Sequence, residues 1–219
     1  MHHCGGSLIT SRHVLTAGHC LSSYDKKQFR LRFADKKKYR IKGLHVHKKY
    51  NKSTYNNDIA IIELEQPVPL DGLVKTVCLP DALRFHYIGM TGVAIGWGRI
   101  AEGEPTSKKL RKVDLPILSE TECEESNYPK GRFTNNMFCA GYMEGQRDSC
   151  NGDSGGALHV RNQLGAMEVV GLVSFGRGCA RPKFPGVYTK VTNYMNWIAD
   201  HIKGECICSM PKDIIQSFV

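Results

Sequence analysis

The segment from Asp148 to Gly156 holds a serine in a setting that suits nucleophilic chemistry. It reads D-S-C-N-G-D-S-G-G, so that Ser154 follows Gly-Asp and precedes two glycines. Glycines permit a tight, open turn in which backbone N–H groups converge and a substrate backbone can approach closely. Because Gly, Asp and Ser are also common in ordinary surface turns, this segment alone does not distinguish the two interpretations.

Two further segments contain the groups that would activate such a serine. His19 lies in V-L-T-A-G-H-C, and Asp58 precedes the apolar run from Ile59 to Ile62. Imidazole titrates near neutrality, so it can take the serine proton and return it to a leaving group. A carboxylate beside an apolar run is costly to bury without a partner, which favours a pairing of Asp58 with His19. The other eight histidines are interpreted as surface or satisfied core residues.

These three segments, with C-G-G-S-L-I at residues 4–9, closely resemble the chymotrypsin-like (trypsin-family) serine proteases. The resemblance covers the chain from His2 to about Lys203 and keeps the family's order of His, Asp and Ser. It implies a catalytic triad of His19, Asp58 and Ser154, in which Asp58 holds the imidazole in the required tautomer. It also implies an oxyanion hole formed by the backbone N–H groups of Gly152 and Ser154.

The same resemblance places Asp148 at the floor of the specificity pocket. A carboxylate there pairs bidentately with Arg, or more loosely with Lys, so we expect an endopeptidase that cleaves after these residues. Phe175 stands where tryptophan is common in the family, and Gly176 would offer backbone hydrogen bonds to an extended substrate. The remaining substrate-binding residues implied by the resemblance are Ser149, Ser174 and Gly186.

Nine cysteines without the CxxC spacing of metal sites indicate disulfides and an oxidising compartment. Cys78, Cys206 and Cys208 stay unassigned: in many relatives a cysteine at the position of Cys78 tethers an upstream pro-segment, and a pairing with Cys206 or Cys208 is the alternative. The resemblance implies three pairs, which are Cys4 with Cys20, Cys123 with Cys139, and Cys150 with Cys179.

The beginning of the chain lacks the features of a signal peptide, and no apolar stretch reaches membrane-spanning length. The cysteines and the glycosylation acceptor at Asn51 nevertheless favour a secreted, extracellular protein. We therefore expect the native product to begin upstream of Met1.

In this family an activating cleavage supplies an ammonium that pairs with the aspartate before the serine, here Asp153. We expect a zymogen, and we expect the chain as given to be inactive without that ammonium, because Asp153 would be an uncompensated buried charge.

The charge balance is basic, with 30 Lys and Arg against 21 Asp and Glu and a net charge of +9. The lysine pairs are scattered and lack interleaved aromatics, which favours a solvated surface and argues against nucleic-acid binding. Lys36 to Lys38 stand where calcium-binding relatives place acidic ligands, so we expect neither metal nor cofactor. The partners implied are polypeptide substrates with Arg or Lys at the cleavage site and protein protease inhibitors, without nucleic acid or membrane.

Short apolar runs bounded by turn residues predict an all-β fold. The resemblance implies two antiparallel Greek-key barrels, the first incomplete, in a protease domain of residues 1–203 with a tail of residues 204–219. Near the end, Val191, Met195, Ile198 and Ile202 recur at helical spacing, and Gly204 offers a stop. The runs expected as strands are residues 6–9, 29–33, 59–64, 92–97, 169–175 and 186–191.

Two other functions compete with the protease. A catalytically silent homologue would act by binding a partner; the retained triad and Asp148 argue against it, and the absent activation segment argues for it. A basic glycan- or nucleic-acid-binding module rests on the lysine clusters alone, and its binding would weaken with added salt.

Overall fold

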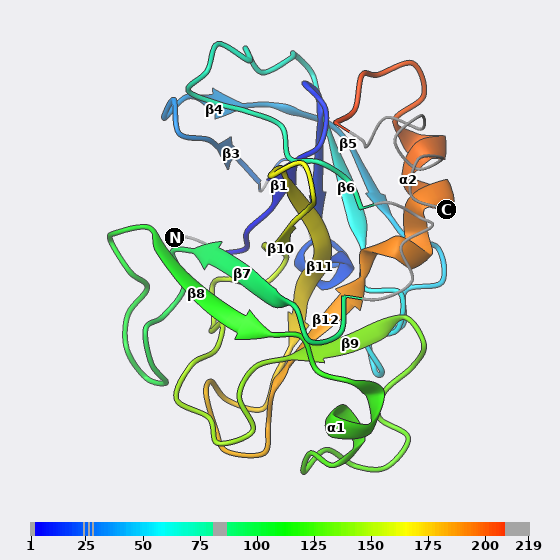
Figure 1. Ribbon diagram of the computed structural model, residues 1–219. Helices are drawn as coiled ribbons and strands as arrows, with labels where there is room; N and C mark the ends of the chain where they lie inside the picture. Colours follow the sequence, from blue (N-terminus) through cyan, green and yellow to red (C-terminus); the bar gives the residue numbers. More distant parts are fainter. Residues whose placement is uncertain (1–2, 24, 26, 28, 81–86, 209–219) are drawn as a thin grey trace.

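The computed structural model describes residues 3–23, 25, 27, 29–80 and 87–208. Its regular elements are mostly antiparallel strands, arranged in two halves that Figure 1 shows as a blue and cyan group above a green, yellow and orange group. The predicted all-β class is therefore confirmed.

The first half is a curled four-stranded sheet in the order β1-β2-β6-β5, with a separate β3-β4 hairpin. Alternate residues of these strands face one core, in which Val14 of β2 and Ile62 and Leu64 of β6 are buried together with Tyr39 of the hairpin. Among the described residues the two sheets do not join, so this half is an open half-barrel, as predicted. The strands are β1 (Ser7–Leu8), β2 (His13–Thr16), β3 (Leu31–Arg32), β4 (Lys38–Tyr39), β5 (Ile41–Val46) and β6 (Ala60–Leu64).

The second half is a six-stranded antiparallel sheet in the order β8-β7-β10-β11-β12-β9. It closes into a barrel because Ile117, just after β8, bridges Ala140 at the end of β9, and because Leu118 N donates to Cys139 O at 3.0 Å. The strands are β7 (Thr91–Gly96), β8 (Arg111–Pro116), β9 (Met137–Ala140), β10 (Ala157–Arg161), β11 (Met167–Phe175) and β12 (Gly186–Lys190).

Two α-helices accompany the strands among the residues that the structure describes. The predicted C-terminal helix is α2 (Met195–His201), preceded by a 3-10 turn over Val191–Tyr194. The other, α1 (Glu120–Glu124), begins at a Ser119 capping box that was not anticipated from the sequence. In the described part of the chain, neither helix has the length and apolar character needed to cross a membrane.

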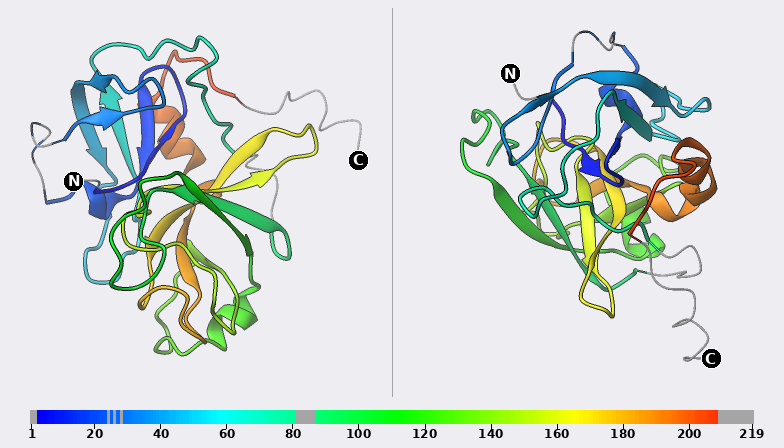
Figure 2. Two further views of the ribbon diagram at one scale, coloured as in Figure 1. Left: turned by 90° about the vertical axis from the view of Figure 1, so that its left-hand side faces the viewer. Right: turned by 90° about the horizontal axis from the view of Figure 1, so that it is seen from above.

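A shared core joins the two halves. Ile9, Leu15 and Ile61 of the first half are buried against Leu172 of β11 and Ile198 of α2. In the left view of Figure 2 the blue and cyan strands lie beside the second barrel, and α2 (orange) is seen behind them. Residues at the ends of strands from both halves therefore meet along one boundary.

The structure contains four disulfides, including all three predicted pairs, Cys4–Cys20, Cys123–Cys139 and Cys150–Cys179. The fourth joins Cys78 to Cys208, which corrects the proposed tether from Cys78 to an upstream segment and selects the competing pairing. The cause is local: Leu79 N donates to Cys208 O at 3.1 Å, so the C-terminal segment lies along residues 78–79. Cys206 is left as an exposed thiol.

Candidate active site

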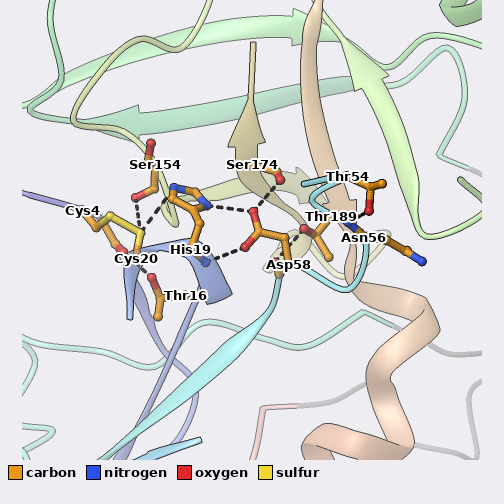
Figure 3. Close-up of polar contacts among 11 residues, drawn as sticks. Cys4, Thr16, His19, Cys20, Thr54, Asn56, Asp58, Ser154, Ser174 and Thr189 are labelled. Carbon is orange, nitrogen blue, oxygen red and sulfur yellow. Dashed lines mark hydrogen bonds and ion pairs between the residues drawn. A yellow bond between two sulfur atoms is a disulfide. The ribbon is translucent and has the colours of Figure 1, made fainter. Parts of the chain in front are cut away.

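His19 and Asp58 meet at the boundary between the two halves (Figure 3). His19 lies in a 3-10 turn, η1 (Gly18–Cys20), directly after β2, and Asp58 lies just before β6. Because β2 and β6 are paired with Thr16 opposite Ala60, their ends bring the two side chains together. His19 Nδ1 lies 2.8 Å from Asp58 Oδ2, and the His19 backbone N–H donates to Oδ1 at 2.7 Å.

Asp58 is fully buried, and its oxygens are supplied with donors from both halves. Ser174 of β11 donates its hydroxyl to Oδ2 at 2.5 Å, and Thr189 of β12 donates to the Asp58 carbonyl at 2.8 Å. Burying a carboxylate without such hydrogen bonds would be costly. Ser174 was expected in the pocket wall, and Thr189 was not identified from the sequence. Their contacts with Asp58 were not anticipated, because neither residue is near Asp58 along the chain.

The Ser154 loop is held between the halves by backbone hydrogen bonds. Ser154 O accepts from Gly5 N at 2.7 Å, and Gly155 N donates to Val173 O at 2.8 Å. Gly155 has a φ of +74°, and a Cβ there would overlap Thr16 Oγ1 and approach Gly5 O to 2.9 Å. The glycine after the serine is therefore required both by its conformation and by the close contact between the halves.

The Ser154 hydroxyl is not hydrogen-bonded to His19 among the described residues. The contact recorded for His19 Nε2 is with Cys20 Sγ at 3.7 Å. In Figure 3 the imidazole lies between Asp58 and Ser154. Catalytic hydrogen bonds of this kind are often formed only in the substrate complex.

Asp148 lies in the interior beside the Cys150–Cys179 disulfide and keeps one oxygen unpaired. Its Oδ2 accepts from Ala180 N at 3.1 Å, whereas the buried Oδ1 has no hydrogen-bond partner among the described residues. Burial raises the pKa of Asp148 to about 6, although the bond from Ala180 opposes the shift. A Cβ on Gly186 would come within 2.9 Å of Oδ1, so a glycine there keeps the carboxylate accessible.

The other residues expected around the pocket lie close by. Ser149 Oγ is 3.1 Å from the hydroxyl of buried Tyr188, which fixes the back of the pocket. Phe175 ends β11, and a Cβ added at the exposed Gly176 would meet nothing nearer than Gly178 O at 3.5 Å. The edge is therefore accessible to an extended peptide.

Asp153 is the second carboxylate in this region. A cavity of about 350 Å³ is lined by both Asp148 and Asp153. The Asp153 carboxylate accepts from Gly98 N at 2.8 Å and from Cys150 N at 3.1 Å. The expectation that Asp153 without an ammonium partner is an uncompensated buried charge is wrong for the structure, because two backbone N–H groups supply hydrogen bonds.

A clamp beside the pocket disulfide was not anticipated from the sequence. Glu102 accepts from Arg181 Nε at 2.7 Å and Nη2 at 2.6 Å, and from Cys179 N at 2.6 Å. The Arg181 guanidinium holds the pKa of Glu102 down to about 2. This ion pair ties the loop after β7 to the pocket disulfide.

The oxyanion and glycosylation assignments can be located but stay predictions. Gly152 has a φ of +102°, a conformation that suits glycine and orients the peptide before Asp153. Asn51 is exposed in a turn, where its Oδ1 accepts from Ser53 N at 2.9 Å and Thr54 N at 3.1 Å. Its side-chain amide is thus accessible at the surface.

One group of side chains has the composition of a metal site. The ligand atoms of Cys4, His19 and Cys20 all lie within 4.8 Å of one another. Both sulfurs belong to one disulfide, so they offer no thiolate to a metal. The cluster is better explained as the disulfide that pins the histidine turn.

The two-barrel fold, with histidine, aspartate and serine meeting between its halves, defines a class of serine proteases. The family model described as Trypsin matches residues 1–198, and the chain belongs to the trypsin family of serine proteases. The chain is 42% identical over 211 residues to trypsin-3 of Salmo salar, with 90% of this chain and 82% of that protein covered. It is 40% identical over 207 residues to cationic trypsin-3 of Rattus norvegicus, with 90% and 78% covered.

Longer relatives also match. The chain is 37% identical to the serine proteinase stubble of Drosophila melanogaster, where the match covers 92% of this chain but 27% of the relative. For the proclotting enzyme of Tachypleus tridentatus the identity is 37%, and the shares are 91% and 58%. The chain thus spans less than two thirds of the length of these two relatives.

Proposed function

We propose that the protein is a serine endopeptidase that hydrolyses peptide bonds after Arg or Lys. The observation that carries this proposal is the buried, unpaired Oδ1 of Asp148, which lies beside Gly186, where the lack of a side chain leaves it accessible. A buried carboxylate oxygen without a donor is costly, and a guanidinium or ammonium of a substrate would supply the donor. The trypsins among the relatives support the same choice.

The proposed chemistry assigns one role to each group of the triad. The Ser154 hydroxyl attacks the scissile carbonyl carbon while His19 Nε2 takes its proton, and Asp58 stabilises the resulting imidazolium. The Gly152 and Ser154 N–H groups hold the oxyanion. The intermediate then collapses, the C–N bond breaks, and His19 gives the proton to the leaving amine. Water repeats the sequence on the acyl-enzyme and releases the carboxylic acid.

The proposal includes synthesis as a zymogen. The carboxylate of Asp153 is turned to Gly98 N, an arrangement that supports a resting form. An activating ammonium would replace the Gly98 contact and draw the Asn151–Gly152 peptide, whose N–H is an oxyanion donor, into a new position. Four disulfides support an oxidising, extracellular compartment, and the exposed Asn51 supports glycosylation there.

Labelling by a peptidyl-arginine phosphonate tests this function, because the reagent needs both an activated serine and an acidic pocket. We expect one adduct, mapped by mass spectrometry to Ser154, and strongly reduced labelling in His19→Ala and Asp148→Ser. Equal labelling by a phenylalanine phosphonate would refute the proposed specificity. An activated protein that no phosphonate labels would favour the catalytically silent homologue that acts by binding a partner.

A further inference from the structure

An aromatic shelf extends from the catalytic histidine along the open edge of the pocket. We define it as Tyr55, Phe175, Tyr128 and Phe184, all of them half-buried. Tyr55 lies 5.7 Å from the His19 ring and 5.4 Å from Phe175, centroid to centroid. Tyr128 continues the series at 6.1 Å from Phe175 and 5.3 Å from Phe184. The shelf is a continuous surface onto which side chains of a bound peptide can pack.

Arg132 covers the first part of this shelf. Its guanidinium carbon lies 4.1 Å from the Phe175 ring centroid and 6.0 Å from that of Tyr55. One nitrogen, Nη1, donates to Thr54 O at 2.6 Å, which fixes the group across the boundary between the halves. A guanidinium has five N–H donors, so this bond leaves others to face a ligand.

Arg177 lies at the other end of the shelf. Its guanidinium carbon is 5.0 Å from the Phe184 centroid, and its backbone N–H donates to Tyr128 Oη at 3.1 Å. Burial raises the pKa of Tyr128, while the charges of Arg132 and Arg177 act in the opposite direction. Both cations are therefore close enough to the same phenol to influence it.

Neither of these two arginines forms an ion pair with a carboxylate in the described part of the chain. Arg181, a few residues further on, differs in this respect because Glu102 neutralises it bidentately. Two uncompensated guanidinium groups on a partly dry aromatic surface form a positive site. Such a site attracts an anionic group more strongly than isolated surface lysines do, because Arg is less strongly hydrated and offers a planar fork.

A substrate bound through Asp148 would pass over this shelf. An extended peptide adds to a strand edge by backbone hydrogen bonds, and residues 174–176 provide the open edge beside the Ser154 loop. The side chains of such a peptide alternate in direction, so those two to four residues before the cleaved bond are the ones that reach Phe175 and its neighbours.

We propose that Arg132 and Arg177 select substrates with an Asp or Glu two to four residues before the cleaved bond. This inference rests on the proposed function, since it takes Asp148 as the site of the cleaved Arg or Lys. It goes beyond that function because it defines an acidic recognition element in addition to the basic one. The preferred substrates would carry a carboxylate upstream of a basic residue.

Peptide binding to Ser154→Ala, in the activated protein, tests this proposal without cleavage. Three peptide pairs with a fixed Arg would differ by Glu or Gln at the second, third or fourth residue before the scissile bond. At one of these three positions we expect the Glu peptide to bind about three- to tenfold more tightly than the Gln peptide at low salt. A ratio of this size is typical of a few favourable exposed ion pairs. The preference should shrink at about 0.5 M NaCl, because the Debye length shortens.

The same measurement in variants identifies the residues responsible. Arg132→Gln and Arg177→Gln should each lower the Glu preference, and the double variant should reduce it to about onefold. Arg161→Gln is the matched control, because Arg161 is an exposed arginine of β10 that also donates to one carbonyl, that of Gly165. The inference would be overturned if the Glu and Gln peptides bound equally in all three pairs, or if the preference for Glu survived in the double variant. Failure of the proposed function would be seen in a different measurement, because the activated protein with Ser154 intact would then cleave none of the peptides.

Discussion

The Ser174 hydroxyl donates to the Asp58 carboxylate at 2.5 Å across 116 residues of sequence. It comes from the strand that forms the edge of the substrate site, and it reaches the carboxylate that orients His19. The second barrel thereby takes part in holding a pair of residues that the first barrel supplies. Substrate binding along residues 174–176 and the alignment of the histidine depend on the same strand.

Ser174→Ala should weaken both the fold and the activity. Asp58 would keep the two donors from His19 but lose the third, and loss of a hydrogen bond to a buried charge costs about 1–3 kcal/mol. We expect the free energy of unfolding to fall by that amount and kcat to fall without a change in the preference for Arg or Lys.

Urea denaturation and peptide kinetics check this expectation, with Ser126→Ala as the control. Ser126 is also buried, but its hydroxyl has no hydrogen-bond partner among the described residues, so its removal should be neutral or slightly stabilising. If the two variants lost equal stability, the Ser174–Asp58 bond would not be the cause.

Gly155→Ala should abolish activity and destabilise the protein severely. The residue has a φ of +74°, and a Cβ there would collide with Thr16 Oγ1 and Gly5 O at the contact between the halves. Gly165→Ala is the control: its φ of +81° is similar, but no atom lies within 4 Å of the added Cβ.

Thermal unfolding separates the two effects in these variants. The control should lose about 1–2 kcal/mol from the left-handed conformation alone, and Gly155→Ala should lose clearly more. Equal losses would show that close contact at Gly155 has no role.

Replacing Asp148 with Asn should stabilise the free protein at neutral pH. The carboxyl has a pKa of about 6 in the folded protein, against an ordinary value of 3.8, so the folded state binds the proton more tightly than the unfolded state does. Stability therefore falls as pH rises from about 4 to 6, and the full penalty, about 3 kcal/mol at 1.4 kcal/mol per pKa unit, applies above that range.

Melting temperatures from about pH 3.5 to 8 check this expectation. The Asn variant should melt higher above about pH 6 and equally near the acid end of that range, while losing cleavage after Arg. For the wild type, KM for an arginyl peptide should fall as pH rises through about 6. A pH-independent difference between the two melting temperatures would contradict the assignment.

Glu102→Gln should loosen the pocket without touching the triad. Because the pKa of Glu102 is lowered to about 2, its stabilising charge is present above its ordinary 4.5 and is lost as pH falls through about 2. Between about pH 5 and 8 we expect a constant increase in KM of about two- to fivefold, with kcat little changed, as for loss of an exposed ion pair.

Steady-state kinetics at several pH values check this effect. Asp200→Asn, which removes a remote exposed partner of Lys203, is the control and should leave KM unchanged. An unchanged KM in Glu102→Gln would show that the clamp does not hold the pocket.

The features that could be predicted from the sequence are those encoded locally. Apolar runs predicted β1, β3, β6, β7, β11 and β12, and the residues around His19, Asp58 and Ser154 carried the family resemblance. Of the run predicted at residues 29–33, only Leu31–Arg32 forms a strand, β3. The aromatic side chains of Phe29 and Phe33 pack on the core, and these two residues do not pair with β4. Strands β2, β4, β5, β8 and β10 were not anticipated because each mixes polar and apolar residues. The apolar strand β9 was not anticipated either.

Contacts between distant residues could not be predicted in this way. The Thr189 bond to the Asp58 carbonyl and the Glu102–Arg181 clamp join residues separated by 131 and 79 positions. The Cys78–Cys208 pair, separated by 130, depended on where the C-terminal segment lies against residue 79. Spacing in the sequence carries no signal for such pairs, since they depend on how the folded chain brings distant segments together.

Sequencing of the cleavage sites in an unfolded protein substrate tests the central claim most directly. The activated protein should cut after Arg or Lys throughout, and Ser154→Ala should leave the substrate intact. Cuts after other residues, or cuts that persist in Ser154→Ala, would contradict the assignment of Asp148 and Ser154.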